Sequence, residues 1–153
     1  MRYVSAAARS LYEAHGGLNY ATAQSAGMDL RACLEPESGD MLHIPPQGRV
    51  LVPSGIAVQP LTEHVVGCIY SRSGLGAREG LTVAQGVGVV DADYRGEIMV
   101  MLLNTSGEYR RLRRGERMAQ LVYHPFLRAD VSVVDALDST ERGAGGFGHT
   151  GSI

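Results

Sequence analysis

The chain has 153 residues, of which 44% are hydrophobic and 20% are charged, and its formal net charge is −2. This length predicts one domain with its own core, and the composition excludes a disordered chain, which would be more polar and more charged. The slight negative charge argues against a protein whose main task is to bind bulk nucleic acid. No run of about 18 apolar residues is present, so no membrane-spanning helix is expected.

The N-terminal stretch does not have the long apolar segment of a signal peptide, because Glu13 and His15 interrupt it. Residues 5–14 are rich in alanine and favour a helix by propensity, which is weak evidence by itself. Cys33 and Cys68 lie in apolar stretches and predict buried thiols rather than a disulfide framework. These features favour the cytoplasm as the location.

Most of the chain after residue 48 reads as short strands separated by turns. Twenty glycines and six prolines divide the chain at short spacing, which is typical of an all-β sandwich or barrel. Residues 73–80 form a second candidate helix. The predicted strands lie within 49–58, in two pieces around Pro53, and within 64–70, 81–90, 97–104, 117–126 and 130–137.

Residues 70–80, YSRSGLGAREG, offer a charged donor, a hydroxyl group and a backbone amide in succession at Arg72, Ser73 and Gly74. At the start of a short helix these groups can form an anion site. The simpler interpretation is a helix N-cap with Ser73 as the capping residue, which needs no ligand. The stretch is not a P-loop, because no Gly-Lys-Ser/Thr follows four residues after a glycine.

Residues 86–97, GVGVVDADYRGE, lead from a glycine-broken apolar strand into two acids, Asp91 and Asp93. Asp91 at a strand end can orient and deprotonate a water molecule, although an aspartate is a weak base at neutral pH. Such a base needs a strongly activated electrophile, such as a metal-bound phosphoanhydride. The alternative is that the acids belong to a polar hairpin tip.

Residues 110–122 contain five arginines within eight positions. A nucleic-acid patch is one interpretation, and a solvated loop with some structural ion pairs is the other. The lack of interleaved aromatic residues favours the loop. Gln120 stands inside an apolar run, where a buried amide needs partners or faces a site. The histidines and cysteines show no zinc-ligand spacing, so a protein-held zinc is not expected.

The chain ends with RGAGGFGHTG, residues 142–151, in which five of the nine residues after Arg142 are glycine. Arg142 can clamp a phosphate and Phe147 can stack on a base. Glycines lose much backbone entropy on ordering, so this stretch considered alone favours disorder.

Five short stretches, in this order along the chain, resemble the five motifs of the homotrimeric dUTPase family. A single match of this kind is weak, whereas five at family-like spacing are highly specific. The stretches are SAGMDLRA (25–32), SRSGLG (71–76), GVVDADYRGEI (88–98), RGERMAQLV (114–122) and RGAGGFGHTG (142–151).

The resemblance implies an all-β fold, a distorted jelly-roll of the β-clip type with one short helix. It implies a homotrimer with active sites between subunits. Residues 1–141 would then form the β domain, and residues 142–153 a flexible arm swapped onto a neighbouring subunit's site. The first 20 residues match the family least, and the family implies a strand there rather than a helix.

The activity implied by the resemblance is that of a dUTP diphosphatase, which hydrolyses dUTP to dUMP and pyrophosphate with Mg²⁺. This reaction limits uracil incorporation into DNA and supplies dUMP for dTTP synthesis. The expected partners are the nucleotide and the other subunits of the homotrimer. No stable binding to nucleic acid or membrane is expected.

The resemblance also assigns roles by motif. Asp91 matches the aspartate that orients the attacking water at the α-phosphorus, and Asp29 matches the first-motif acid that acts on the metal through water. Tyr94 matches the tyrosine that packs under the deoxyribose, where a ribose 2′-hydroxyl would clash. The backbone around Val89 and Val90 matches the hairpin that hydrogen-bonds uracil.

The remaining matches are substrate contacts or their supports. Arg142 matches the clamp on the γ-phosphate, and Phe147 matches the ring that covers uracil. Gln85 stands where many relatives have asparagine near the uracil edge, and His149 replaces a common serine. The other substrate-binding residues implied are Arg72, Ser73, Gly74, Met99, Gln120, Gly148 and Thr150.

Two alternatives share this fold. dCTP deaminase needs a glutamate base on the strand after the third motif, and this chain has Met101 near that position. Methionine cannot deprotonate water, so deamination is disfavoured. The other alternative is a binding module without activity, which would not require Asp91. The joint presence of Asp91, Arg142 and Phe147 argues against it.

Overall fold

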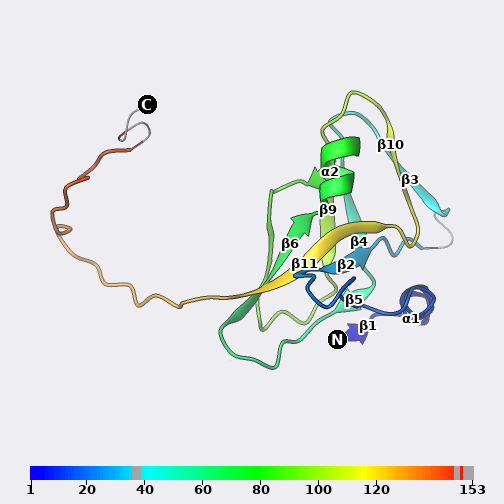
Figure 1. Ribbon diagram of the computed structural model, residues 1–153, viewed down its shortest axis with the longest axis horizontal. Coiled ribbons are helices and arrows are strands. Elements are labelled where there is room, and N and C mark those ends of the chain that lie inside the picture. Colours follow the sequence, from blue (N-terminus) through cyan, green and yellow to red (C-terminus); the bar gives the residue numbers. More distant parts are fainter. Residues whose placement is uncertain (36–38, 147–148, 150–153) are drawn as a thin grey trace.

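The computed structural model describes residues 1–35, 39–146 and 149. Its body consists of short antiparallel strands with two short helices beside them (Figure 1). The helices are α1 (Ala6–Glu13) and α2 (Ser73–Glu79). The strands are β1 (Arg2–Tyr3), β2 (Met28–Arg31), β3 (Met41–Ile44), β4 (Arg49–Pro53), β5 (Ile56–Ala57), β6 (Val65–Ser71), β7 (Leu81–Val83), β8 (Gly88–Val90), β9 (Met99–Asn104), β10 (Arg110–Arg113) and β11 (Arg117–Pro125).

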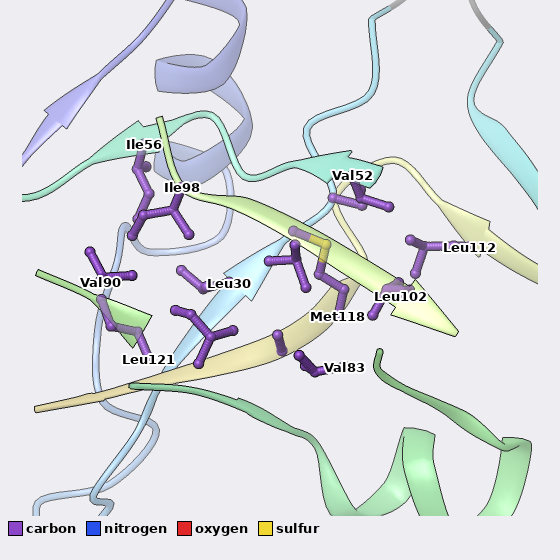
Figure 2. Packing of buried hydrophobic residues seen from close by; sticks show 14 of the residues in the cluster. Leu30, Val52, Ile56, Val83, Val90, Ile98, Leu102, Leu112, Met118 and Leu121 are labelled. Atoms are coloured by element: carbon purple, nitrogen blue, oxygen red, sulfur yellow. The ribbon is translucent and has the colours of Figure 1, made fainter. Parts of the chain in front are cut away.

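Two sheets contribute most of the core. The larger has the strand order β2-β11-β6-β8 and the smaller has the order β4-β9-β7. Buried residues alternate with more exposed ones along β9, as expected for a strand with one face on a core. Figure 2 shows side chains of both sheets meeting in this core, among them Leu30, Val90 and Leu121 from the larger sheet and Val52, Val83 and Leu102 from the smaller.

The N-terminal segment forms a helix, so the strand expected in the first 20 residues is wrong except for the two residues of β1. Ser5 caps α1, because its side-chain oxygen accepts a hydrogen bond from the Ala8 N–H at 3.0 Å. Leu11 and Tyr12 are buried on one face of the helix. Capping by Ser5 and burial of one face thus add to the helix propensity of the alanines. The β fold is therefore accompanied by two short helices, not by the one that was expected.

Most of the other predicted strands are confirmed, and the chain turns at Gly86 between β7 and β8 as its glycines indicate. The strand predicted for 130–137 is wrong. That segment has no strand, and Val131 and Val133 are 88% and 99% exposed. A β-branched sequence does not form a strand where it has no neighbouring strand to pair with.

The arginine-rich segment is partly a strand rather than a loop. Arg110–Arg113 forms β10, which pairs with β3 and buries Leu112. The structural ion pairs predicted for this segment are present, since Arg110 lies 3.4 Å from Glu108 and Arg117 lies 3.1 Å from Asp29.

The two cysteines are free thiols, with Cys33 buried and Cys68 half-buried. Burial raises the pKa of Cys33. Neither helix of the described chain is long and apolar enough to cross a membrane.

Tyr12 connects α1 to strand β2 of the larger sheet. Its ring is completely buried, and its hydroxyl oxygen accepts a hydrogen bond from the Arg31 N–H at 3.1 Å. Burial raises the pKa of Tyr12 from 10.0 to about 12, because the phenolate would be desolvated there.

This shift predicts how stability depends on alkaline pH. The unfolded chain loses the Tyr12 proton at lower pH than the folded chain, so the free energy of unfolding falls as pH rises from 10.0 to about 12. The part due to Tyr12 reaches about 2–3 kcal/mol. Urea denaturation across this range should show a shallower fall for Tyr12→Phe than for the unchanged chain. Equal slopes would contradict the prediction.

Candidate active site

A cavity of about 220 Å³ lies beside β8 and the loop that follows it. Apolar walls with a few polar groups suit a flat ring with polar edges. Six of the predicted site residues line the cavity: Gln85, Val89, Val90, Asp91, Tyr94 and Met99. The other lining residues, which the sequence did not single out, are Ile69, Val83, Gly88, Glu97, Ile98 and Val100.

Strand β8 provides a free backbone edge at this cavity. It is an end strand of the larger sheet, and within the described part of the chain it pairs only with β6, with Val89 opposite Cys68. The N–H and C=O groups on its other edge are therefore available to a ligand. Gly88 packs closely on β6, because a Cβ atom there would lie 3.1 Å from the Ile69 Cβ.

The loop after β8 is a compact turn. The Tyr94 N–H donates to the Asp91 carbonyl at 3.1 Å, and the Tyr94 hydroxyl donates to the Glu97 carbonyl at 2.9 Å. Arg95 adds a hydrogen bond to the Ala92 carbonyl at 2.7 Å. Asp91 is exposed and lines the cavity. The acids do lie in a turn, but the hairpin-tip interpretation is wrong, because β8 and β9 on either side of this loop belong to different sheets and do not pair with each other.

A second group of predicted residues surrounds Asp29 on β2. The Arg72 Nε donates to Asp29 Oδ1 at 2.8 Å, and the Arg117 Nη1 donates to Asp29 Oδ2 at 3.1 Å. Gln120 on β11 is opposite Asp29 on one side and Tyr70 on the other. Asp29, Arg72 and Gln120 thus come together as the motifs predict.

This second group carries an excess of positive charge. Arg31 pairs with Arg117 across the β2–β11 ladder. Burial lowers the pKa of Arg31, and the neighbouring Arg117 cation lowers it further. Arg72 and Arg117 pair with the one carboxylate of Asp29, whereas the Arg31 guanidinium donates to the Gly115 carbonyl at 2.8 Å and adds a third positive charge beside them. Such a group suits an anion with several oxygens, such as a phosphate.

Helix α2 begins immediately after Arg72. Ser73 is its first residue, and Arg72 occupies the N-cap position without a side-chain capping hydrogen bond. The interpretation of Ser73 as a helix cap is therefore wrong. The Ser73 hydroxyl and the Gly74 amide follow the Arg72 guanidinium directly in the chain, in the order predicted for an anion site.

The predicted residues form two separate groups, and a third set lies apart from both. The residues that line the cavity include none of Arg72, Ser73, Gly74 or Gln120. Strands β2 and β8 are three strand spacings apart in the larger sheet, which is about 14 Å.

The third set belongs to the C-terminal segment, whose described residues from 126 to 146 run away from the body (Figure 1). Arg142 is exposed there, and its Nε donates to the Gly145 carbonyl at 2.8 Å. His149 is exposed as well. Phe147, Gly148 and Thr150 lie outside the described residues.

Asp29 is the carboxylate among the predicted residues that was expected to act on a metal ion. Both of its oxygens accept hydrogen bonds from arginines. Across residues 1–35, 39–146 and 149, no three His, Cys, Asp or Glu side chains gather in a way that could hold a metal ion. Mg²⁺ usually keeps several waters and takes phosphate oxygens with one or two carboxylates, which this arrangement allows.

The chain is similar to known proteins along most of its length. The family model described as dUTPase matches residues 16–151. A deoxyuridine 5′-triphosphate nucleotidohydrolase of Salmonella typhimurium is 42% identical over 132 residues, which cover 86% of this chain and 85% of that protein.

Two solved structures match the fold. A mutant dUTPase of Staphylococcus bacteriophage 80alpha, solved with dUpNHpp, has a TM-score of 0.77 at 24% identity over 98% of this chain and 96% of that one. A mutant dUTPase from phage phi11 of S. aureus, whose structure reveals the coordination of a structural Mg(II) ion, has a TM-score of 0.70 at 21% identity. That match covers 90% of this chain and 97% of the phage protein.

The Asp29 cluster predicts a measurable loss of stability. Asp29→Asn leaves the guanidinium groups of Arg72 and Arg117 without their anion, and the side chains of Asp29 and Arg72 are only 17% and 22% exposed. We expect the free energy of unfolding to fall by about 1–3 kcal/mol in urea denaturation. The control is Glu13→Gln, which breaks an ion pair with Arg9 whose side chains are 58% and 63% exposed. A change below about 0.5 kcal/mol is expected there. Equal losses in the two variants would contradict the prediction.

Proposed function

The chain belongs to the dUTPase family, and on that premise we propose that it hydrolyses dUTP to dUMP and pyrophosphate by attack of water on the α-phosphorus. The observation that carries this proposal is the cavity in which the free edge of β8, Asp91 and Tyr94 meet. A relative with 42% identity is named as a deoxyuridine triphosphate nucleotidohydrolase, which supports the same activity.

The cavity suits uracil in both shape and chemistry. Its apolar walls, which include Val83 and Ile98, can hold the faces of the ring. The free backbone groups around Val89 and Val90 can pair with the polar edge of the base, and Gln85 lines the same space. Cytosine would present a donor where uracil has an acceptor, and an unpaired buried polar group gives strong discrimination.

The sugar and the water lie on the loop side of the cavity in this proposal. Tyr94 packs under the deoxyribose, where a ribose 2′-hydroxyl would clash with the ring. Asp91 orients the attacking water and accepts its proton. Holding the nucleophile in line supplies much of the rate acceleration, so a weak carboxylate base is sufficient.

The triphosphate binds to the cationic group around Asp29. The Arg72 guanidinium, the Ser73 hydroxyl and the Gly74 amide contact phosphate oxygens, and Gln120 supports them from β11. Mg²⁺ bound by the triphosphate neutralises its charge, and Asp29 would reach that ion through water. The unbalanced positive charge of the three arginines supports this assignment.

We further propose that the active site is completed by other copies of the chain in a homotrimer. The base cavity and the cationic group are about 14 Å apart across one sheet and share no residue. The segment after β11 exposes apolar side chains, with Leu127 98% and Leu137 89% exposed. A row of exposed apolar residues is usually covered by a partner.

In this assembly residues 1–141 are the β domain and residues 142–153 are an arm that closes over a neighbouring subunit's site. Arg142 binds the γ-phosphate and Phe147 covers the uracil ring. Gly148, His149 and Thr150 add contacts to the nucleotide. The enzyme then acts on free nucleotide in the cytoplasm, where it limits uracil in DNA and supplies dUMP.

Deamination of dCTP is the weaker candidate. Met101 lies on β9 near the place where a deaminase needs a glutamate, and it does not line the cavity. The cavity has one carboxylate besides Asp91, that of Glu97, and its Oε1 already accepts a hydrogen bond from the Gly55 N–H at 2.6 Å.

Replacing the proposed base tests the reaction. The unchanged protein with Mg²⁺ should release pyrophosphate from dUTP and no ammonia from dCTP. Asp91→Asn should lower kcat by at least about a thousandfold, because the water loses its base, and should change the Kd for dUpNHpp only slightly. Asp93→Asn is the matched control, since Asp93 lies two residues away and does not line the cavity. Normal turnover by Asp91→Asn would refute the mechanism, and ammonia from dCTP would refute the substrate.

Removing the arm tests the assembly. Deletion of residues 142–153 leaves the described core and its sheets complete, so the truncated chain should remain folded and trimeric by light scattering. Its kcat/KM for dUTP should fall at least about tenfold, since contacts to the γ-phosphate and the base are lost. A truncated chain with unchanged kcat/KM would contradict the role of the arm, and a monomeric full-length chain would contradict the trimer.

A further inference from the structure

We propose that Gly96 and Glu97 are positioning residues that fix the Tyr94 ring and thereby set the preference for deoxyribose over ribose. This inference rests on the proposed function, in which Tyr94 packs under the sugar. The motifs did not single out either residue for a role, and both follow Tyr94 closely in the loop after β8.

The Tyr94 ring folds back over Gly96. A Cβ atom at position 96 would lie 2.5 Å from the Tyr94 Cζ and 2.9 Å from its Cε2, which is closer than real Cβ atoms approach other heavy atoms. Gly96 is not among the glycines with positive φ, so its backbone conformation is one that other residues adopt. A side chain at position 96 would therefore have to displace the Tyr94 ring, whereas the backbone would accept it.

Glu97 holds the other end of the ring. Its carbonyl oxygen accepts the Tyr94 hydroxyl at 2.9 Å, and its carboxylate Oε1 accepts the Gly55 N–H at 2.6 Å. The second hydrogen bond ties the loop after β8 to the turn between β4 and β5. The carbonyl that receives the tyrosine hydroxyl is consequently fixed in direction by the side chain of the same residue.

The anchor at Gly55 is itself rigid. Gly55 has φ +76, and a Cβ atom there would lie 2.8 Å from both the Ala8 Cβ and the Cys33 Sγ. Its carbonyl accepts the Val4 N–H at 3.0 Å. The turn is thus packed between α1, the N-terminal strand and the end of β2, and it gives Glu97 a fixed partner.

To discriminate between deoxyribose and ribose, the Tyr94 ring has to stay in place. A ribose differs from a deoxyribose by one hydroxyl group, and a tyrosine that could move aside by about 1 Å would admit it, since displacements of this size change rates by about a hundredfold. Glycine at 96 keeps the ring seated on the loop, and Glu97 keeps its hydroxyl end in place.

The test measures kcat/KM for dUTP and for UTP in Gly96→Ala. The added methyl group should displace the ring, and the dUTP/UTP ratio should fall at least about tenfold. Gly107→Ala is the matched control, because Gly107 has no positive φ and a Cβ there would meet nothing within 4 Å. That control should keep the ratio of the unchanged chain. An unchanged ratio in Gly96→Ala, or equal losses with both nucleotides, would overturn the inference.

A double-mutant cycle separates positioning from a merely structural effect. In a Tyr94→Ala background, Gly96→Ala should have no further effect on the ratio, because the ring through which it acts is gone. An effect of full size in that background would overturn the inference.

Glu97 provides an independent pair of variants if Gly96→Ala fails to fold. Glu97→Ala removes the acceptor for the Gly55 N–H and should lower the dUTP/UTP ratio, whereas Glu97→Gln keeps an acceptor oxygen and should restore most of it. A normal ratio in Glu97→Ala would count against the role of Glu97. If the unchanged chain does not hydrolyse dUTP, the proposed function fails by itself. The positioning role is then decided by the affinity ratio for dUMP and UMP in calorimetry, with the same shifts expected.

Discussion

The unpaired edge of β8 is the constraint on which the candidate site depends. A free strand edge is usually a liability, since its N–H and C=O groups can pair with another chain. Here β8 has three residues, pairs with β6 on one side only, and leaves Val89 66% exposed. The free N–H and C=O groups of β8 can be paired by a ligand whose acceptors and donors match them in position. In the proposed function a base with donors and acceptors on one edge pairs with them without any further strand, and the loop after β8 would then place Asp91 and Tyr94 beside that base.

The positively charged group around Asp29 lies at the opposite edge of the same sheet, on β2. Arg72 and Arg117 are already aligned by the Asp29 carboxylate, so little side-chain freedom remains to be lost when an anion binds. Arg31 adds a third cation and makes the group positive overall. A chain with a net charge of −2 thus concentrates positive charge at one place, which in the proposed function is where the triphosphate binds.

The sequence predicts those features that are local in the chain. Short β-rich segments between glycines predict the strands, and the motifs predict six of the residues that line the cavity as well as the neighbours Arg72 and Gln120 of Asp29. Contacts between distant segments are not visible in this way. Arg117 and Asp29 are 88 residues apart, and nothing in either segment indicates their pairing. The failed strand at 130–137 has the same origin, because strand propensity requires a neighbouring strand that the single chain does not provide. Gly96 was overlooked because a glycine in a turn is usually explained by its backbone, and here its neighbour's ring is the reason.

A series of contacts links the N-terminal helix α1 to Tyr94, and the family resemblance does not predict it. The family model begins at residue 16, whereas α1 ends at Glu13. Yet Ala8 of this helix and the Val4 N–H both contact Gly55, and Gly55 donates to the carboxylate of Glu97, whose carbonyl holds Tyr94. Gly55 leaves little room for movement in this series, because its positive φ and the Ala8 and Cys33 side chains packed against it favour glycine there. A segment outside the family match therefore supports the residue that we propose to distinguish one sugar from the other, and on that proposal differences among relatives in this segment are a physical route by which their selectivity can differ.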